Sequence, residues 1–362
     1  MNLIEAPKDW NQASTFDEIP SEKGFYFPAE WEEHEATWLS WPHNSETWPG
    51  KIDSIYPAYC EFIKLVAEGE KVKINVRDKA MAEEAFAKIK KSGADMSQVF
   101  FYVNPTNDAW CRDHGPAFLV NKEFNKKIIV DWGFNAWGGK YPPFDLDDVI
   151  PTRIANQLGL PVAQADIVME GGSVEFNGKG TVLTTTSCLL NKNRNPHLSK
   201  DQIEEYLKNY YGVTQILWLG DGIIGDDTDG HIDDITRFVN ETTVVTAIEE
   251  DPNDENYEPL KVNRELLMGV TINQSPLIVV DLPMPKARYY KGQRLPMSYA
   301  NFYISNKYVV VPVFGDPNDE KAVFILQGCF PTRKVVGVDS SDIIWGLGSF
   351  HCLSQQEPKL SK

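Results

Sequence analysis

Residues 173–185 read SVEFNGKGTVLTT, in which Asn177 and Gly178 lie between two short apolar runs. An Asn-Gly pair in this position favours the tight turn of a β-hairpin, because both residues accept positive φ angles. Ser199 and Gln202 then form a capping-box pattern, and apolar or aromatic residues follow at 203, 206, 207 and 210, which predicts an amphipathic helix. The segment GVTQILWL at 212–219 predicts another strand. The centre of the chain therefore has the order hairpin, helix, strand.

The same order recurs along the rest of the chain. Periodic patterns predict strands at 71–76, 98–103 and 126–132, and a helix at 78–92 that ends at Gly93. Further expectations are hairpins within 235–248 and 301–314, a helix at 317–328 opened by Pro317, and a strand at 334–338. The acidic segment 249–259 is expected to be a surface loop, with a partner site as the less favoured alternative. No flexible linker interrupts this alternation, so residues 1–362 are predicted to form a single α/β domain.

The chain is strongly acidic, with 35 Lys and Arg against 52 Asp and Glu and a net charge of −17. This charge opposes binding to nucleic acids and anionic membranes and favours a small cationic ligand. No apolar run reaches the roughly 18 residues of a membrane span, and the first stretch lacks the features of a secretory signal, so we expect a cytoplasmic protein. The five cysteines are widely spaced without a CxxC, which argues against a disulfide framework or a zinc ribbon.

Four Gly-containing stretches concentrate residues that can carry chemistry. They are NDAWCRDHGP (107–116), MEGGSVEF (169–176), GDDTDGHIDDITRF (225–238) and WGLGSFHCLSQQEP (345–358). Each of the first three follows a predicted strand, which is where α/β proteins place active-site loops. The last stretch sets a thiol, Cys352, directly after a His and shortly after two glycines, which allow the backbone to approach another group closely.

Together these stretches offer a nucleophile, a proton carrier and an excess of carboxylates. Cys352 could attack a substrate while His231 carries protons, and Glu170 could fix the tautomer of that His. An acyl-transfer site needs donors for an oxyanion and gives no reason for surplus acids. A guanidinium substrate would explain the surplus acids, because carboxylates pair with a guanidinium bidentately. The surplus acids are Asp113, Asp227, Asp229, Asp233 and Asp234.

Each of these residues also has an ordinary explanation. Cys352 could be a packed core residue, His231 could cap a turn, and Asp113 could form an ion pair with Arg112. The DDTDGHIDD segment is as acidic as a calcium loop but lacks the closing Glu of an EF-hand. A metal site of His, Cys and Asp fits the residue types, yet no paired ligand spacing supports it. No single motif decides between these alternatives.

As a set, the motifs resemble the porphyromonas-type peptidyl-arginine deiminase family, and in particular its agmatine deiminases, within the superfamily of guanidino-group-modifying enzymes. The resemblance runs from PAEWEEHEATWLSWPHN (28–44) to HCLSQQEP (351–358), nearly the whole chain. Between them NDAWCRDHGP, DWGFNAWGG, EGGS, NKNRNP, DTDGHIDD and FGD fall in the expected order. This resemblance implies a five-bladed α/β propeller of pseudo-repeated ββαβ units, the pentein fold, around a central site, and a homodimer.

The resemblance also implies a reaction and the residues that perform it. Cys352 corresponds to the nucleophile, His231 to the general acid and base, and Glu170 to the buried carboxylate partner of that His. The implied reaction is hydrolysis of agmatine to N-carbamoylputrescine and ammonia through a thiouronium on Cys352. Neither a metal nor an organic cofactor is expected.

Other residues are expected to bind the substrate. Asp113 and Asp233 correspond to the two carboxylates that hold the guanidinium, and Trp110 to an aromatic residue beside the substrate chain. Our own hypothesis is that Asp227 or Asp229, both near His231, binds the distal ammonium of agmatine. The alternatives are deimination of free arginine or of peptidyl-arginine, which would require a Lys or Arg at the far end of the pocket, and a non-catalytic polyamine- or guanidine-binding protein. A metalloprotein is the weakest alternative.

The stretch before Cys352 departs from the pattern usual in the family, GGGNIHC. Leu347, Ser349 and Phe350 stand where Gly, Asn and Ile are usual, while Gly346 and Gly348 are kept. The bulk of Leu347 bears on how the substrate fits more than on the thiol chemistry. We expect Leu347 to turn away from the ligand if its φ angle is negative.

Overall fold

The central hairpin, helix and strand form as the sequence predicts. In the computed structural model, which describes residues 1–7, 9–10 and 12–360, β8 (Val174–Phe176) and β9 (Thr181–Thr185) are antiparallel. Gly178 has φ of 66°, and a Cβ there would lie 2.6 Å from the backbone nitrogen of Ala29, so the turn needs glycine. Helix α8 (Lys200–Tyr211) begins at the expected capping box, and β10 (Gln215–Leu219) runs parallel to β9.

Three further three-stranded sheets of the described chain repeat this unit of an antiparallel pair, a helix and a parallel third strand. They are β5 (Ala117–Asn121), β6 (Lys126–Gly133), α6 (Ile150–Leu158) and β7 (Val162–Val168); β11 (Thr236–Asn240), β12 (Thr243–Ile248), α9 (Tyr257–Leu267) and β15 (Ile278–Pro283); and β18 (Tyr303–Ile304), β19 (Tyr308–Val313), α10 (Asp319–Cys329) and β20 (Lys334–Asp339). The α/β class is therefore confirmed.

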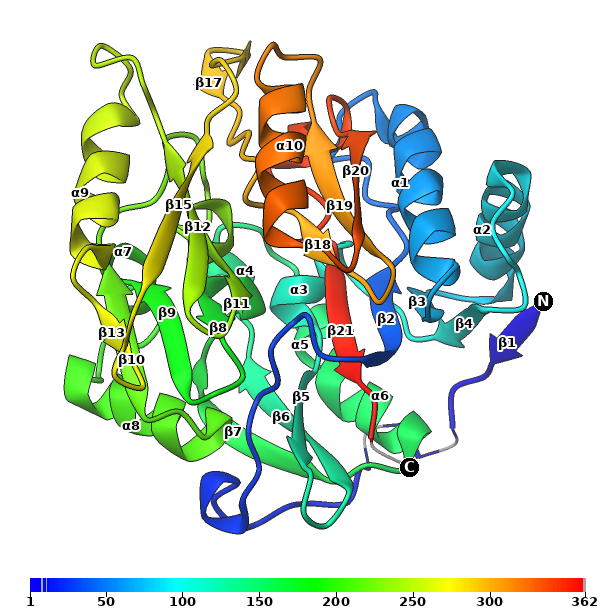
Figure 1. Cartoon of the computed structure of the whole chain (residues 1–362). Coiled ribbons are helices and arrows are strands. Elements are labelled where there is room, and N and C mark those ends of the chain that lie inside the picture. Colours follow the sequence, from blue (N-terminus) through cyan, green and yellow to red (C-terminus); the bar gives the residue numbers. More distant parts are fainter. Residues whose placement is uncertain (8, 11, 361–362) are drawn as a thin grey trace.

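The largest described sheet joins the two ends of the chain, and Figure 1 shows β21 beside β2. Its order is β1-β4-β3-β2-β21, with β21 antiparallel to β2 and the other neighbours parallel. The elements are β1 (Asn2–Ile4), β2 (His34–Ser40), α1 (Ile52–Ala67), β3 (Lys71–Val76), α2 (Lys79–Ser92), β4 (Val99–Val103) and β21 (Ser354–Pro358). β21, β2, α1 and β3 again have the order strand, antiparallel strand, helix, parallel strand.

The remaining described elements are short, and several of them contribute to the candidate site. They are α3 (Cys111–His114), α4 (Ala136–Gly139), α5 (Asp145–Asp148), α7 (Thr186–Leu189), η1 (Ser21–Lys23), η2 (Gly171–Ser173), η3 (Ile232–Asp234), η4 (Ile343–Gly346), and the two-stranded ribbons β13 (Thr271–Ile272) with β14 (Ser275–Pro276) and β16 (Tyr289–Tyr290) with β17 (Gln293–Arg294). In Figure 1, α3 lies near the middle of the molecule while α1, α2, α8, α9 and α10 lie toward its outside. None of the described helices has the length and apolar character needed to cross a membrane.

Two predicted boundaries are wrong. Helix α10 begins at Asp319 rather than at Pro317, because residues 317–318 form a turn before the helix starts. The expected surface loop at 249–259 already enters α9 at Tyr257. The helix at 78–92 ends as expected, since Gly93 has φ of 85° and its backbone nitrogen bonds to the carbonyl of Lys90.

Candidate active site

Cys352 lies between η4 and β21 and lines a cavity of about 770 Å³. The two glycines before it explain how the backbone reaches that cavity. A Cβ on Gly348 would lie 2.6 Å from the Trp110 ring and 3.1 Å from Cβ of Cys352, and one on Gly346 would lie 2.8 Å from the same ring. Both glycines are therefore required for close packing against Trp110, which also lines the cavity.

Leu347 differs from our expectation. Its φ angle is +72°, which lies in the left-handed region, so the negative φ that would turn the side chain away from a ligand is not found. A non-glycine residue there costs about 1–2 kcal/mol. Leu347 lines the cavity, whereas Ser349 bonds to Ser340 and Phe350 stacks on Phe62 in the core. Of the three departures from the family pattern, only Leu347 can therefore touch a ligand in the cavity.

The thiol of Cys352 is surrounded by acids. Its Sγ lies 3.6 Å from Oδ2 of Asp233, which η3 carries. Burial, followed by the charges of Asp233, Asp234 and Asp113, raises the pKa of Cys352 well above its ordinary value of 9. A cation that enters and compensates these carboxylates would therefore favour the thiolate.

Asp113, on α3, accepts hydrogen bonds from donors on α4 and η2. Its Oδ2 accepts a hydrogen bond of 3.0 Å from the indole of Trp137, and its Oδ1 accepts one of 3.1 Å from the backbone of Gly172. Burial raises the pKa of Asp113 to about 6, assisted by Asp233 and opposed by His231. Arg112 does not pair with Asp113; its carboxylate partner is Glu30, at 3.5 Å.

Gly172 brings three predicted site residues to one point. A Cβ on this glycine would lie 2.5 Å from Nδ1 of His231, 2.9 Å from Oδ1 of Asp113 and 3.1 Å from Oδ2 of Asp233. Only a residue without a side chain lets these groups converge. The EGGS motif therefore supplies both the carboxylate Glu170 and the space beside it.

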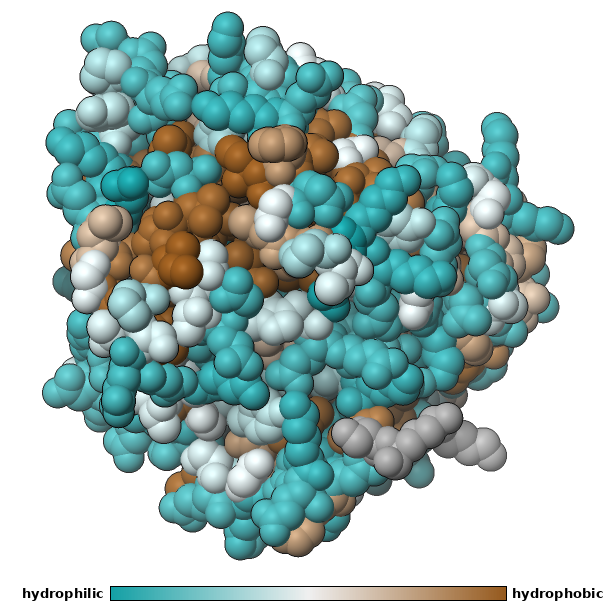
Figure 2. All heavy atoms as spheres, in the orientation of Figure 1, coloured by the Kyte–Doolittle hydropathy of each residue, from teal (hydrophilic) through white to brown (hydrophobic). Residues whose placement is uncertain are grey.

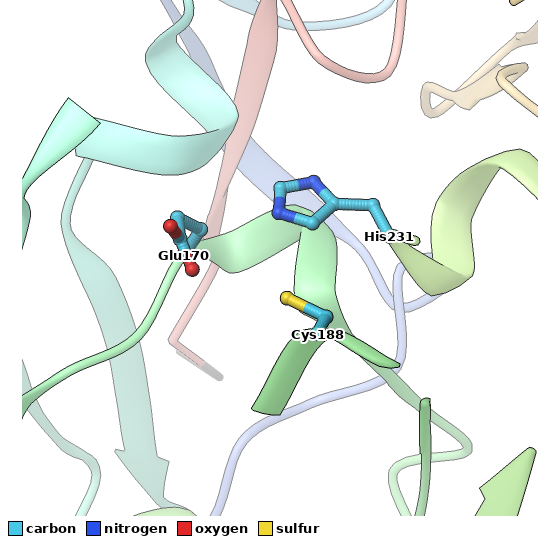
Figure 3. A group of neighbouring side chains, drawn as sticks. All are labelled: Glu170, Cys188 and His231. Carbon is cyan, nitrogen blue, oxygen red and sulfur yellow. The ribbon is translucent and has the colours of Figure 1, made fainter. Parts of the chain in front are cut away.

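Figure 3 shows His231, Glu170 and Cys188 pointing toward one another. Glu170 uses Oε1 to bind Arg194 at 2.7 Å, while its Oε2 and both ring nitrogens of His231 have no hydrogen-bond partner among the described residues. Burial by itself would lower the pKa of His231, but Asp113, Cys188 and Asp233 raise it well above its ordinary value. A buried imidazolium suits a proton donor to a leaving group.

Two groups in the site have the donor types of a metal centre. Glu170, Cys188 and His231 place one donor atom each within 4.8 Å of one another, and Asp233, Asp234 and Cys352 do the same. Cys, His and carboxylate oxygen are ligands that suit zinc. Both groups include residues predicted to act in catalysis, so a metal bound there would occupy the groups that the reaction needs.

Asp227 and Asp229 differ in where they point. Asp227 lines the cavity and accepts a hydrogen bond from Tyr141, with Nζ of Lys140 3.6 Å away. Asp229 does not line the cavity; it binds Arg194 and Lys140, and these contacts lower its pKa against the effect of burial. Of the two, only Asp227 is therefore placed to meet a ligand in the cavity.

The predicted site residues come together except for Asp229, but sequence reasoning missed a layer beneath them. Nδ1 of His351 is hydrogen-bonded to Asp233 at 2.7 Å and Nε2 to Glu30 at 2.8 Å. Arg237 contacts Glu30 at 3.0 Å and Glu175 at 2.9 Å. Position next to Cys352 was the one feature of the sequence that could have indicated His351.

The fold and the site thus define an α/β protein with a buried thiol, an imidazole and converging carboxylates at the end of a cavity open to a small cation. The family model for porphyromonas-type peptidyl-arginine deiminases matches residues 26–358. A Legionella pneumophila protein provisionally named agmatine deiminase is 39% identical over 346 residues, covering 95% of this chain and 97% of that protein. The chain belongs to the porphyromonas-type peptidyl-arginine deiminase family.

Solved structures agree with this membership. An agmatine deiminase of Enterococcus faecalis matches with a TM-score of 0.88 at 33% identity, covering 96% of this chain and 100% of that one. A substituted agmatine deiminase of C. jejuni with substrate bound matches with a TM-score of 0.84 at 36% identity, covering 93% and 97%. An amidinotransferase of Microseira wollei, at 15% identity and a TM-score of 0.52, shares the fold alone.

Proposed function

We propose that this protein hydrolyses agmatine to N-carbamoylputrescine and ammonia. The observation that carries the proposal is the lining of the cavity that ends at Cys352. Among the described residues that line it there is no Lys or Arg, whereas five are acids: Glu46, Asp108, Asp113, Asp147 and Asp227. Such a cavity favours a substrate with a cation at each end over one that carries a carboxylate. The names of the relatives support the same substrate.

Asp113 and Asp233 bind the guanidinium, and Trp110 packs beside the substrate chain. The bound cation offsets the carboxylates around Cys352, so the thiol can lose its proton and the sulfur faces the central carbon of the guanidinium. A C–S bond forms as an electron pair of the C–N π bond moves to nitrogen. The imidazolium of His231 gives its proton to one nitrogen, the C–N bond breaks, and ammonia leaves a thiouronium on Cys352.

Water completes the cycle. Neutral His231, beside Glu170, removes a proton from water, and the resulting hydroxide attacks the thiouronium carbon. The C–S bond breaks, Cys352 leaves as thiolate, and the protonated ureido group gives its proton to solvent or to ammonia. The proton of the Cys352 thiol passes to solvent as the substrate binds, His231 carries the proton of the leaving group and of the attacking water, and the steps require no metal or organic cofactor.

Asp227 is our choice for the distal ammonium, because it lines the cavity and Asp229 does not. Replacing Asp227 by Asn should raise KM for agmatine more than it lowers kcat, since the contact is far from the reacting carbon. Asp229→Asn serves as the matched comparison. Unchanged KM in Asp227→Asn would remove this assignment.

We also propose the arrangement of the domain, its cellular location and its oligomeric state. Residues 1–362 form one catalytic domain in which the five repeated units are blades of a propeller; the units of the described sheets support this arrangement. A cytoplasmic location fits five cysteines that are all free.

We also infer a homodimer. Figure 2 shows hydrophobic side chains gathered over β15 and α10, where Ile278 is 56% and Phe324 80% exposed. Light scattering of wild type and Phe324→Glu tests the dimer, which the substitution should dissociate.

The decisive assay is ammonia release from agmatine, free arginine and a peptide with C-terminal arginine, each with and without chelator. Release from agmatine alone, unaffected by chelator and abolished in Cys352→Ala, is the expected result. Release only from the carboxylated substrates would transfer the proposal to arginine deimination. Binding of agmatine without release by the wild type would favour a polyamine-binding protein instead.

A further inference from the structure

Asn301 is a buried amide, two residues before β18, that contacts the nucleophile on two sides. Its Nδ2 donates to Sγ of Cys352 at 3.0 Å and to Oδ1 of Asp234 at 2.9 Å. Its Oδ1 accepts from the backbone nitrogens of Cys352 at 3.2 Å and His351 at 3.1 Å. One side chain therefore fixes both the sulfur and the backbone that carries it.

The sulfur needs such a donor because its other polar neighbours are acids. Asp233 and Asp234 face it from η3, and Asp113 faces it from α3. These carboxylates favour the neutral thiol, whereas an N–H donor favours the thiolate, and Asn301 is the side chain that lowers the pKa of Cys352 against them. Asp234 orients the amide by accepting the second N–H, so the donor remains directed at the sulfur.

We propose that Asn301 is a catalytic residue that stabilises the thiolate of Cys352 and holds it in position for attack. The proposal rests on the proposed function, in which Cys352 is the nucleophile. In that reaction the sulfur bears negative charge twice, before the C–S bond forms and after it breaks. A donor already fixed on Sγ lowers the energy of both states without reorganising during the reaction.

The test is the reactivity of Cys352 toward iodoacetamide as a function of pH, which requires no substrate. Tryptic cleavage gives one peptide, residues 335–359, in which Cys352 is the sole cysteine, so mass spectrometry follows this thiol alone. Asn301→Asp retains an oxygen for the two backbone N–H groups but loses the donor to sulfur. Asn263→Asp is the matched control, since Asn263 is also fully buried and bonded through both ends of its amide to Gly220 and Asp221.

We expect the pH profile for alkylation of Cys352 in Asn301→Asp to shift to higher pH by about one unit or more, which corresponds to a tenfold loss of thiolate at fixed pH. The profile of Asn263→Asp should overlay that of the wild type. With agmatine, kcat should fall tenfold or more and KM should change by less than threefold. If Asn301→Asp does not fold, Asn301→Ala replaces it, because it places no charge beside Asp234.

An alkylation profile that overlays the wild type in the folded Asn301 variants would overturn the proposal, as would an unchanged kcat. The proposed function can fail independently of this result. If the wild type releases no ammonia from agmatine but the alkylation profile of the variants is shifted, Asn301 still stabilises the thiolate, and agmatine is not the substrate.

Discussion

Replacing Asp113 by Asn should raise the free energy of unfolding relative to that of the wild type as pH rises, although it removes a carboxylate that we propose binds the substrate. Burial raises the pKa of Asp113 from its ordinary 3.8 to about 6. The folded state therefore binds this proton more tightly than the unfolded state. The stability associated with the group is intact below the unfolded pKa and is lost as pH rises through the folded pKa.

The magnitude follows from the shift. About 2 pKa units correspond to roughly 3 kcal/mol of destabilisation at pH 8, of which roughly 1 kcal/mol is already present at pH 4.5. Asn cannot accept both hydrogen bonds that Trp137 and Gly172 donate, so the absolute stability of the variant is lowered by an unpaired donor. That cost is the same at both pH values. Between pH 4.5 and pH 8 the free energy of unfolding of Asp113→Asn should therefore rise by about 2 kcal/mol relative to that of the wild type.

Urea unfolding of wild type and Asp113→Asn at pH 4.5, 6 and 8 measures this change, and thermal melts should show a relative gain of about 3 °C for a chain of this length. The exposed Asp166→Asn is the control, with a ΔΔG that stays constant over the same range. A ΔΔG for Asp113→Asn that is constant from pH 4.5 to pH 8 would refute the reasoning, because burial would then not disfavour the carboxylate. kcat/KM for agmatine should fall at least a hundredfold in the same variant.

Three other changes follow from the cavity. Gly348→Ala places a Cβ 2.6 Å from Trp110, so we expect kcat/KM to fall at least tenfold, measured by ammonia release; unchanged kinetics would contradict the close-packing argument. Leu347→Gly relieves the left-handed strain but increases the conformational entropy of the unfolded chain, so the free energy of unfolding in urea should stay within about 1 kcal/mol of wild type. A loss beyond about 3 kcal/mol would show that Leu347 is mainly a packing residue. Micromolar Zn²⁺ should inhibit turnover reversibly through Cys188 or Cys352 and their neighbours, with EDTA restoring the rate; full activity in excess Zn²⁺ would show that neither group closes on a metal.

Local patterns were sufficient for much of the fold. The turn at Asn177 and Gly178 and the capping box at Ser199 depend on neighbours in sequence, so they could be predicted without the rest of the chain. The motifs also placed the residues that meet at Gly172. The sign of φ at Leu347 could not be predicted, because packing of the flanking glycines against Trp110 fixes the backbone there.

The polar contacts of Asn301 could not be predicted either, because they join residues 50 to 67 positions apart and no motif marks the amide. The same holds for His351 and Glu30, which are 321 positions apart in sequence and 2.8 Å apart in the structure. Local spacing carries information about elements and motifs, whereas these contacts arise only when several sheets meet.

Two layers of charge explain how the site keeps carboxylates ionised inside the protein. In the lower layer Arg237, His351 and Arg112 neutralise Glu30, whose pKa falls well below its ordinary value although burial acts in the opposite direction. His351 extends this compensation upward, because its hydrogen bond and charge lower the pKa of Asp233 against burial. Asp113 lies 3.7 Å from Nδ1 of His231, but burial and the charges of Asp233 and Glu170 outweigh this neighbour, and the pKa of Asp113 rises. The neighbours of Asp233 therefore favour its charged form, whereas burial favours the neutral form of Asp113, and a guanidinium bound as we propose would shift Asp113 towards its charged form.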